Sequence, residues 1–229
     1  MRFRSIIILI VLFISCKVFA QEERSFIIPD YSEIERLTKD EGSLFFYDNL
    51  FERYSVNDPD LSLRDYLFLY YGHFFQPDYA PFVKTQEADS IRAVFHSKNE
   101  LTDDDWQTIL RLAEENLKQN PFDLKGLNIV WLANQRTGNN EAAAIYLNKL
   151  KKLVQTILSS GDGITENTAF HVLNISHEYD IIHILGYEFG GQQELTPEKC
   201  DYLSLKDNSD NVHGLYFNVQ QIFKGYEKP

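Results

Sequence analysis

Apolar residues recur at helical spacing from Leu101 to Leu158, where three consecutive amphipathic segments can be traced. The first is predicted to begin after Thr102, whose hydroxyl suits a helix N-cap, with three aspartates in the first turn that complement the helix dipole. Asn120-Pro121 is expected to end it, because proline disfavours a helical conformation in the preceding residue. The pattern predicts helices that form a scaffold.

The second segment, about Phe122 to Arg136, is apolar nearly all round at its centre. Such a helix is usually covered on several sides, so Trp131 at its midpoint is expected to be a core residue. The alternative is that Trp131 lines an open groove as a binding anchor, because tryptophan is a common interface hot spot. Gly138-Asn139 indicates a turn to a third helix, which Gly161-Asp162-Gly163 is expected to end.

Helical patterning also precedes these segments, from Tyr31 to Phe82, and it is rich in aromatic residues. A helix is predicted from Ser43 to Tyr54, and Ser62 is expected to cap the next one, which has two apolar faces. Tyr70 and Tyr71 lie on these faces and could form a stacking platform for a sugar or peptide. A helix that is buried between neighbours would show the same pattern, and this is the reading that we favour.

After Ser160 the patterning changes to short apolar runs that suit strands. Two of these runs flank the polar turn Asp207–Asn211, which suggests an antiparallel hairpin. Ser176 is expected to cap a short helix between strands. The predicted fold is α+β: a helical array over residues 21–160, then a small, mostly antiparallel sheet within residues 161–229, packed together as one unit. The strand candidates are Ala169–Ile175, Tyr187–Phe189, Cys200–Leu205 and Leu215–Val219.

Residues 1–20 have the features of a secretory signal peptide. Arg2 and Arg4 precede nine unbroken apolar residues, and Ala20 suits cleavage before Gln21. The apolar run is too short to span a membrane, which takes roughly 20 residues. The alternative is a lipoprotein signal that uses Cys16, although the residues around it fit poorly. We expect an exported protein, periplasmic or secreted, with no membrane span in the mature chain.

The charge of the mature chain bears on its partners. The full chain has 22 basic and 34 acidic residues, and removal of residues 1–20 leaves a net charge of −15. Nucleic acid would repel such a chain, so it is not expected as a partner. Cys200 is the one cysteine left after cleavage, which excludes an intramolecular disulfide.

Few residues suggest chemistry. Asp180 and His183 share a helical face, so they could form an acid–base pair, with Cys200 as a conceivable nucleophile. His171, His177 and His183 are spaced six residues apart, which could suggest a metal site. Residues six apart lie on different faces of a helix and about 20 Å apart on a strand, so these histidines are not expected to share an ion. No metal site and no cofactor are expected, since phosphate-binding loops and zinc-protease motifs are also absent from the sequence.

The helical hairpin resembles about one and a half degenerate tetratricopeptide units. Gly138 aligns with the glycine of the inter-helix turn, Leu127 and Ala143 fall on two further consensus positions, and Pro121 falls where a preceding unit would end. Trp131 departs from the pattern, because it stands where the consensus has glycine. The resemblance implies paired helices that can form a concave face.

Several short motifs, in order along nearly all of the mature chain, resemble those of one family of exported bacterial proteins. The family is classed as a domain of unknown function (number four-nine-one-nine), so the resemblance implies no activity and no site residue. The motifs are Leu69-Tyr70-Tyr71-Gly72, Asn120-Pro121-Phe122-Asp123, Ser160-Gly161-Asp162-Gly163, Glu178-Tyr179-Asp180, Cys200-Asp201-Tyr202-Leu203 and Gly214-Leu215-Tyr216-Phe217-Asn218-Val219.

Two functions from different classes follow as hypotheses. The first is a binding module of the cell envelope, in which helical hairpins form a groove for a peptide or protein. The second is a hydrolase that uses polar groups of the C-terminal sheet. The hydrolase hypothesis requires His171, Asp180, His183, Cys200 or Asp201 to converge in a pocket, whereas the binding hypothesis requires an open groove along the helices.

Export generates the first testable prediction. N-terminal sequencing of the protein recovered from outside the cytoplasm should begin at Gln21, because Ala20 is the small residue that a signal peptidase cuts after. Recovery of a lipid-modified Cys16 at the N-terminus would contradict soluble export.

Overall fold

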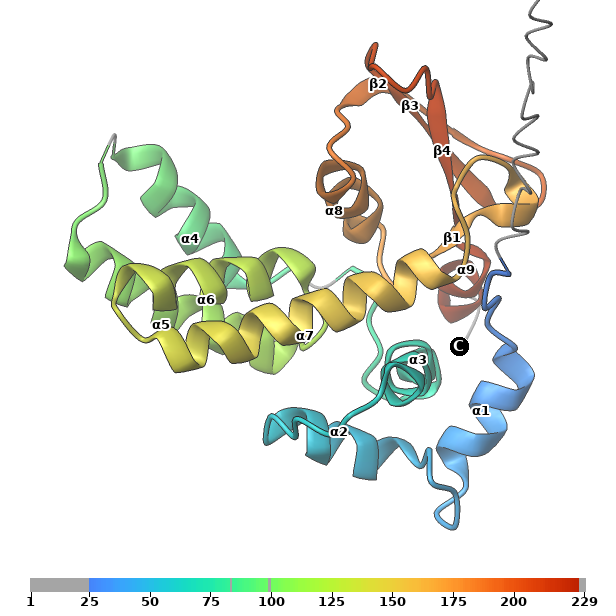
Figure 1. Ribbon diagram of the computed structural model, residues 1–229, viewed down its shortest axis with the longest axis horizontal. Coiled ribbons are helices and arrows are strands. Elements are labelled where there is room, and N and C mark those ends of the chain that lie inside the picture. Colours follow the sequence, from blue (N-terminus) through green and yellow to red (C-terminus); the bar gives the residue numbers. More distant parts are fainter. Residues whose placement is uncertain (1–24, 83, 99, 227–229) are drawn as a thin grey trace, which may run out of the picture.

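The computed structural model describes residues 25–82, 84–98 and 100–226, and the predicted signal peptide lies outside them. The fold is α+β as predicted, with helices first and a small sheet after them (Figure 1). The helical part comprises α1 (Tyr31–Lys39), α2 (Tyr47–Ser55), α3 (Leu63–Gly72), the 3-10 helix η1 (His73–Phe75), α4 (Gln86–Ser97), α5 (Asp103–Gln119), α6 (Leu124–Arg136) and α7 (Asn140–Ser159). The remainder comprises η2 (Glu166–Thr168), β1 (Phe170–His171), α8 (Ser176–Ile184), β2 (Phe189–Leu195), β3 (Cys200–Leu205), β4 (Gly214–Asn218) and α9 (Gln220–Tyr226).

Helix starts and turns follow local chemistry where the sequence predicted it. Thr102 caps α5 in a capping box with Asp105, and Ser62 caps α3 in the same way with Asp65. Gly138 has a φ of +80° in the turn between α6 and α7, a conformation that glycine adopts without steric cost.

Other predicted boundaries were wrong. Helix α2 begins at Tyr47 rather than Ser43, because residues 41–45 form turns. The end of α7 is an exception: the helix stops at Ser159, just before the glycines as predicted, although the C-cap itself is Ser160. Before α8, the Asn174 side chain accepts a hydrogen bond from the Ser176 N–H, so Ser176 is the first helical residue and not the cap.

The sheet has four strands in the order β1-β4-β3-β2. Strand β1 pairs with β4 in parallel, and the other two pairs are antiparallel. The sheet is therefore mostly antiparallel, as predicted. Strands β3 and β4 flank the predicted turn Asp207–Asn211. The strand expected from Ala169 to Ile175 is only two residues long, because the backbone of Leu173 bonds to tyrosine side chains instead of a neighbouring strand.

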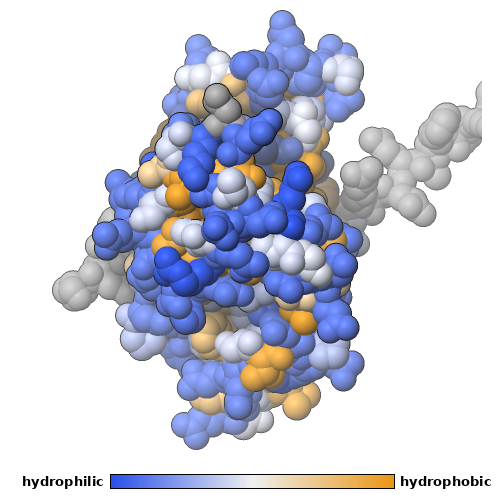
Figure 2. Space-filling model, turned by 90° about the vertical axis from the view of Figure 1, so that its left-hand side faces the viewer, coloured by the Kyte–Doolittle hydropathy of each residue, from blue (hydrophilic) through white to orange (hydrophobic). Residues whose placement is uncertain are grey.

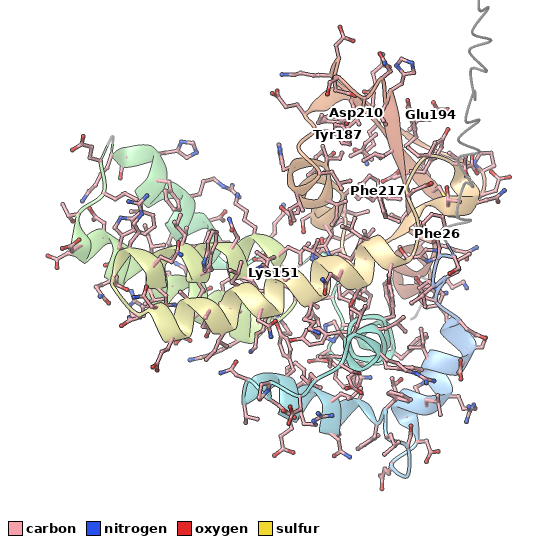
Figure 3. All side chains as sticks on the ribbon, in the orientation of Figure 1. Phe26, Lys151, Tyr187, Glu194, Asp210 and Phe217 are labelled. Atoms are coloured by element: carbon pink, nitrogen blue, oxygen red, sulfur yellow. The ribbon has the colours of Figure 1, made fainter. Side chains whose placement is uncertain are left out.

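Helix α7 runs through the middle of the molecule (Figure 1). Helices α1–α3 lie on one side of it, the sheet and α8 on the other, and α4–α6 extend from its N-terminal half. A large core includes residues from α1, α3, α7, α8 and the sheet, and a smaller one lies among α4, α5 and α6. Phe217, on the side of β4 that faces α8, belongs to the large core (Figure 3).

Helix α6 is covered on one stripe and not all round. Its buried residues, which include Leu127, Val130 and Ala133, recur at spacings of three and four, while Trp131 is partly exposed and outside both cores. The expectation of a core tryptophan was therefore wrong. Helices α5 and α7 pack against the buried stripe, and the rest of the surface of α6 stays open.

The surface at the α4–α6 end is mostly hydrophilic, with hydrophobic residues in small separate patches (Figure 2). Within the described part of the chain, no helix combines the length and apolarity needed to cross a membrane.

Candidate functional site

A cleft of about 310 Å³ lies where the helical part meets the segment before α8. Its walls come from α2, η1, the loop at 76–80, the α5–α6 junction and the segment 173–177. The cleft is lined by aromatic rings, carboxylates, amides and two imidazoles: Tyr47, Asp48, Phe51, His73, Gln76, Pro77, Asp78, Tyr79, Ala80, Lys118, Gln119, Asn120, Pro121, Leu173, Asn174 and His177.

Three tyrosine hydroxyls hold the segment 171–173 that forms one wall, and we call them the tyrosine clamp (Tyr70, Tyr71 and Tyr79). Tyr70 Oη accepts a hydrogen bond from the Leu173 N–H at 3.0 Å. Tyr71 donates to the His171 carbonyl at 3.2 Å, and Tyr79 donates to the Leu173 carbonyl at 2.9 Å. The clamp satisfies backbone groups that the short strand β1 leaves unpaired.

The clamp also fixes the orientation of His177. Tyr70 Oη lies 2.7 Å from His177 Nδ1 and already accepts from the Leu173 N–H, so its own proton goes to Nδ1. This arrangement assigns the neutral tautomer with its proton on Nε2. Burial lowers the pKa of His177 to about 4, against the opposite effect of the Asp123 carboxylate and the Phe122 backbone. The ring is therefore neutral at physiological pH.

The Nε2 atom of His177 has no hydrogen bond of ordinary geometry to a described residue, although the Phe122 backbone lies nearby. The side chain is 1% exposed and borders the cleft. A weak hydrogen bond to the Phe122 backbone is the contact that remains for this buried N–H.

A second imidazole, that of His73 from η1, also lines the cleft and likewise has a tyrosine hydroxyl at its Nδ1. His73 Nδ1 lies 2.7 Å from the Tyr47 hydroxyl. Burial lowers the pKa of His73 to about 4, with a smaller opposite effect of Asp78. Both imidazoles of the cleft are therefore neutral hydrogen-bonding groups rather than cations.

Two acidic side chains of α8, Glu178 and the half-buried Asp180, follow His177 along the helix. Glu178 is fully buried, and burial together with the Asp201 carboxylate raises its pKa to about 9. Neither of its carboxyl oxygens has a hydrogen bond of ordinary geometry to a described residue. Burial and Asp123 raise the pKa of Asp180 to about 7, and Lys125 partly offsets them. Glu178 is therefore protonated at neutral pH.

The cleft continues along α2 into two further hollows. One of about 430 Å³ shares Phe51, Lys118 and Pro121 with the cleft. The next, of about 230 Å³, shares Tyr54 and Lys149 with that hollow. Each hollow shares lining residues with its neighbour, so the three adjoin one another along α2, and we call this row of hollows the α2 groove.

The residues that the sequence singled out for catalysis do not come together. Asp180 is half-buried, His183 is exposed, and no hydrogen bond joins them among the described contacts. Cys200 is buried, its Sγ contacts the Glu166 carbonyl at 3.9 Å, and burial raises the pKa of the thiol to about 11. A protonated, covered thiol is a poor nucleophile.

The candidate binding residues divide between core and surface. Tyr70 and Tyr71 are fully buried, so their rings present no face to a ligand, and their hydroxyls serve the tyrosine clamp. Trp131 is partly exposed but lines none of the three hollows of the α2 groove. The sequence did contain a signal for the site, since Tyr70 lies in one of the family motifs and His177 directly precedes another. Their pairing could not be predicted, because it is a contact between residues far apart in the sequence.

Metal binding has no support from side-chain clusters. Among residues 25–82, 84–98 and 100–226, no group of three or more His, Cys, Asp or Glu side chains is placed to hold an ion.

The comparisons with known proteins give one match. The family model described as "Domain of unknown function (DUF4919)" matches residues 32–228, which include the whole α2 groove and the sheet. No curated protein and no solved structure matches the chain.

The buried carboxyl of Glu178 generates a pH prediction. Its pKa is about 9 in the folded state against 4.5 ordinarily, so as the pH rises between these values the unfolded state loses its proton first and the free energy of unfolding falls. Glu178→Gln keeps the shape without the charge. We expect the variant to exceed the wild type in stability by roughly 2 kcal/mol or more near pH 8 and to match it near pH 4.

Urea unfolding at several pH values measures this difference. The control is Glu194→Gln on β2, because Glu194 is an exposed glutamate of the sheet and is not among the groups that shift the pKa of Glu178 (Figure 3). Equal pH dependence in Glu178→Gln and wild type would contradict a protonated Glu178.

Proposed function

The chain belongs to the DUF4919 family, and from this premise we propose that it is an exported binding module of the cell envelope, with the α2 groove as the seat of a short peptide segment. Export and ligand are proposals that rest on the signal-like sequence of residues 1–20 and on the form of the groove. The observation that carries the proposal is the row of three adjoining hollows along α2.

The dimensions of the groove suit an extended chain. Helix α2 has nine residues, which corresponds to about 13 Å at the rise of an α-helix. An extended peptide advances about 3.3 Å per residue, so roughly four residues span the length of α2. A compact metabolite would fill one hollow and leave the others empty.

The lining of the groove also suits a peptide. Aromatic side chains of α2, Phe51 and Tyr54, offer apolar contact along its length. Amide side chains such as Asn120 and Asn174 can pair with peptide N–H and C=O groups in the cleft. The tyrosine clamp makes the wall at the cleft end rigid, which reduces the entropy lost on binding.

Hydrolysis has weaker support. Among the described residues that line the cleft there is no Ser, Thr or Cys to act as a nucleophile beside His73 or His177. The lowered pKa of both imidazoles makes them weak bases, whereas a general base works best with a pKa near the operating pH. The hydrolase hypothesis would therefore need an activated water and a stronger base.

Selection from a random hexapeptide library on immobilised protein (residues 21–229) tests the proposal. We expect enrichment of related sequences on the wild type. Phe51→Ala should reduce capture about tenfold or more, because Phe51 lines both the cleft and the adjoining hollow.

The control for this selection is Phe95→Ala. Phe95 is a partly exposed phenylalanine on α4 that contacts Trp106 and lies outside the groove. Thermal melts should show that both variants are folded. No enriched peptide, or equal capture by Phe51→Ala and wild type, would overturn the proposal.

A further inference from the structure

Lys149 is a buried lysine of α7 that lies where two hollows of the α2 groove meet. The residue is 8% exposed and lines both the hollow that adjoins the cleft and the one beyond it. Its Nζ lies 4.1 Å from the centroid of the Tyr54 ring and 5.7 Å from that of Tyr146. Cation–π attraction to these rings holds the ammonium in a fixed place in the groove wall.

This ammonium has no acidic partner among the described residues. Among the carboxylates that line the same hollows, Asp58 pairs with Arg53 at 2.6 Å and Glu115 pairs with Lys118 at 2.7 Å, while Glu114 forms no ion pair with Lys149. Buried lysines are rare unless they are paired, because removing a charge from water is costly.

The ammonium is nevertheless largely charged at neutral pH. Burial lowers the pKa of Lys149 to about 8, which keeps most of the population protonated at pH 7. The aromatic rings offset part of the desolvation cost but accept no hydrogen bond of ordinary strength. No hydrogen bond from this ammonium is found among the described residues, so its three donors have unused capacity beside the two hollows.

We propose that Lys149 is a carboxylate-binding subsite of the α2 groove. Its ammonium pairs with a carboxylate of the bound peptide, supplied by the C-terminus or by an Asp or Glu side chain. The inference rests on the proposed function and adds the chemical class of the ligand. Charge-assisted hydrogen bonds to an ammonium are among the stronger polar contacts, and the low polarity around Tyr54 and Tyr146 strengthens this one.

The test uses small defined probes and the ¹³Cε and ¹⁵Nζ resonances of Lys149 in the full mature chain. Acetate carries the carboxylate alone, and acetamide is its neutral counterpart. N-acetyl-tetraalanine as free acid, N-acetyl-tetraalanine amide, and the amide with one alanine replaced by glutamate separate a C-terminal carboxylate from a side-chain carboxylate.

We expect acetate and at least one carboxylate-bearing peptide to shift the Lys149 signals saturably and to raise the pKa of the ammonium. Acetamide and tetraalanine amide should have neither effect. Lys149→Met keeps the length of the stem and removes the charge, so it should weaken binding of the carboxylate peptide about 10- to 100-fold. Its melting temperature should equal or exceed that of the wild type, since a buried charge is lost.

The matched control is Lys151→Met. Lys151 lies two residues further along α7 on its exposed side (Figure 3), and its loss should leave carboxylate binding unchanged. Equal affinity of the wild type for N-acetyl-tetraalanine and its amide, or unshifted Lys149 signals in acetate, would overturn the carboxylate subsite. Neither result would contradict peptide binding by the α2 groove. Acetate binding at Lys149 with no capture of any peptide would support the carboxylate site and overturn the peptide function.

Discussion

The Tyr70 hydroxyl is the contact on which the rest of the structure depends. It comes from the last turn of α3, accepts a hydrogen bond from the Leu173 N–H and donates one to His177. One oxygen thereby joins the helical part, the end of β1 and the start of α8. Tyr71 and Tyr79 donate to the carbonyls of His171 and Leu173, which lie 100 and 94 positions further along the chain. The wall of the cleft is therefore positioned by side chains that are distant in sequence.

Burial of several ionisable groups makes the free energy of unfolding depend on pH. His73, His171 and His177 have pKa values lowered to about 4 by burial, so the folded state loses stability as the pH falls from about 6.5 towards 4. Glu178 acts in the opposite direction, since its raised pKa removes stability as the pH rises. Groups of this kind are common where a protein places polar atoms for a ligand.

Much of the architecture could be predicted from local patterns, because caps, turns and helical periodicity are local. Thr102, Ser62 and Gly138 act as the sequence indicated. Trp131 was misjudged because hydropathy along a helix does not reveal which neighbours cover it. The site was the least predictable part, because the Tyr70–His177 pair spans 107 positions. The sequence drew attention instead to Asp180 and His183, which lie three residues apart on α8.

Unfolding of Tyr70→Phe, followed separately by a helical and a C-terminal probe, tests the central claim most directly. Loss of the hydroxyl leaves the Leu173 N–H and His177 Nδ1 buried without partners, which should lower the free energy of unfolding by roughly 2–4 kcal/mol, with both probes in one transition. Tyr66→Phe on the same helix is the control, because the buried Tyr66 has no hydroxyl hydrogen bond among the described contacts. Equal stability of the two variants, or separate unfolding transitions for the two parts, would contradict the claim that the Tyr70 hydroxyl joins the helical part to the C-terminal part.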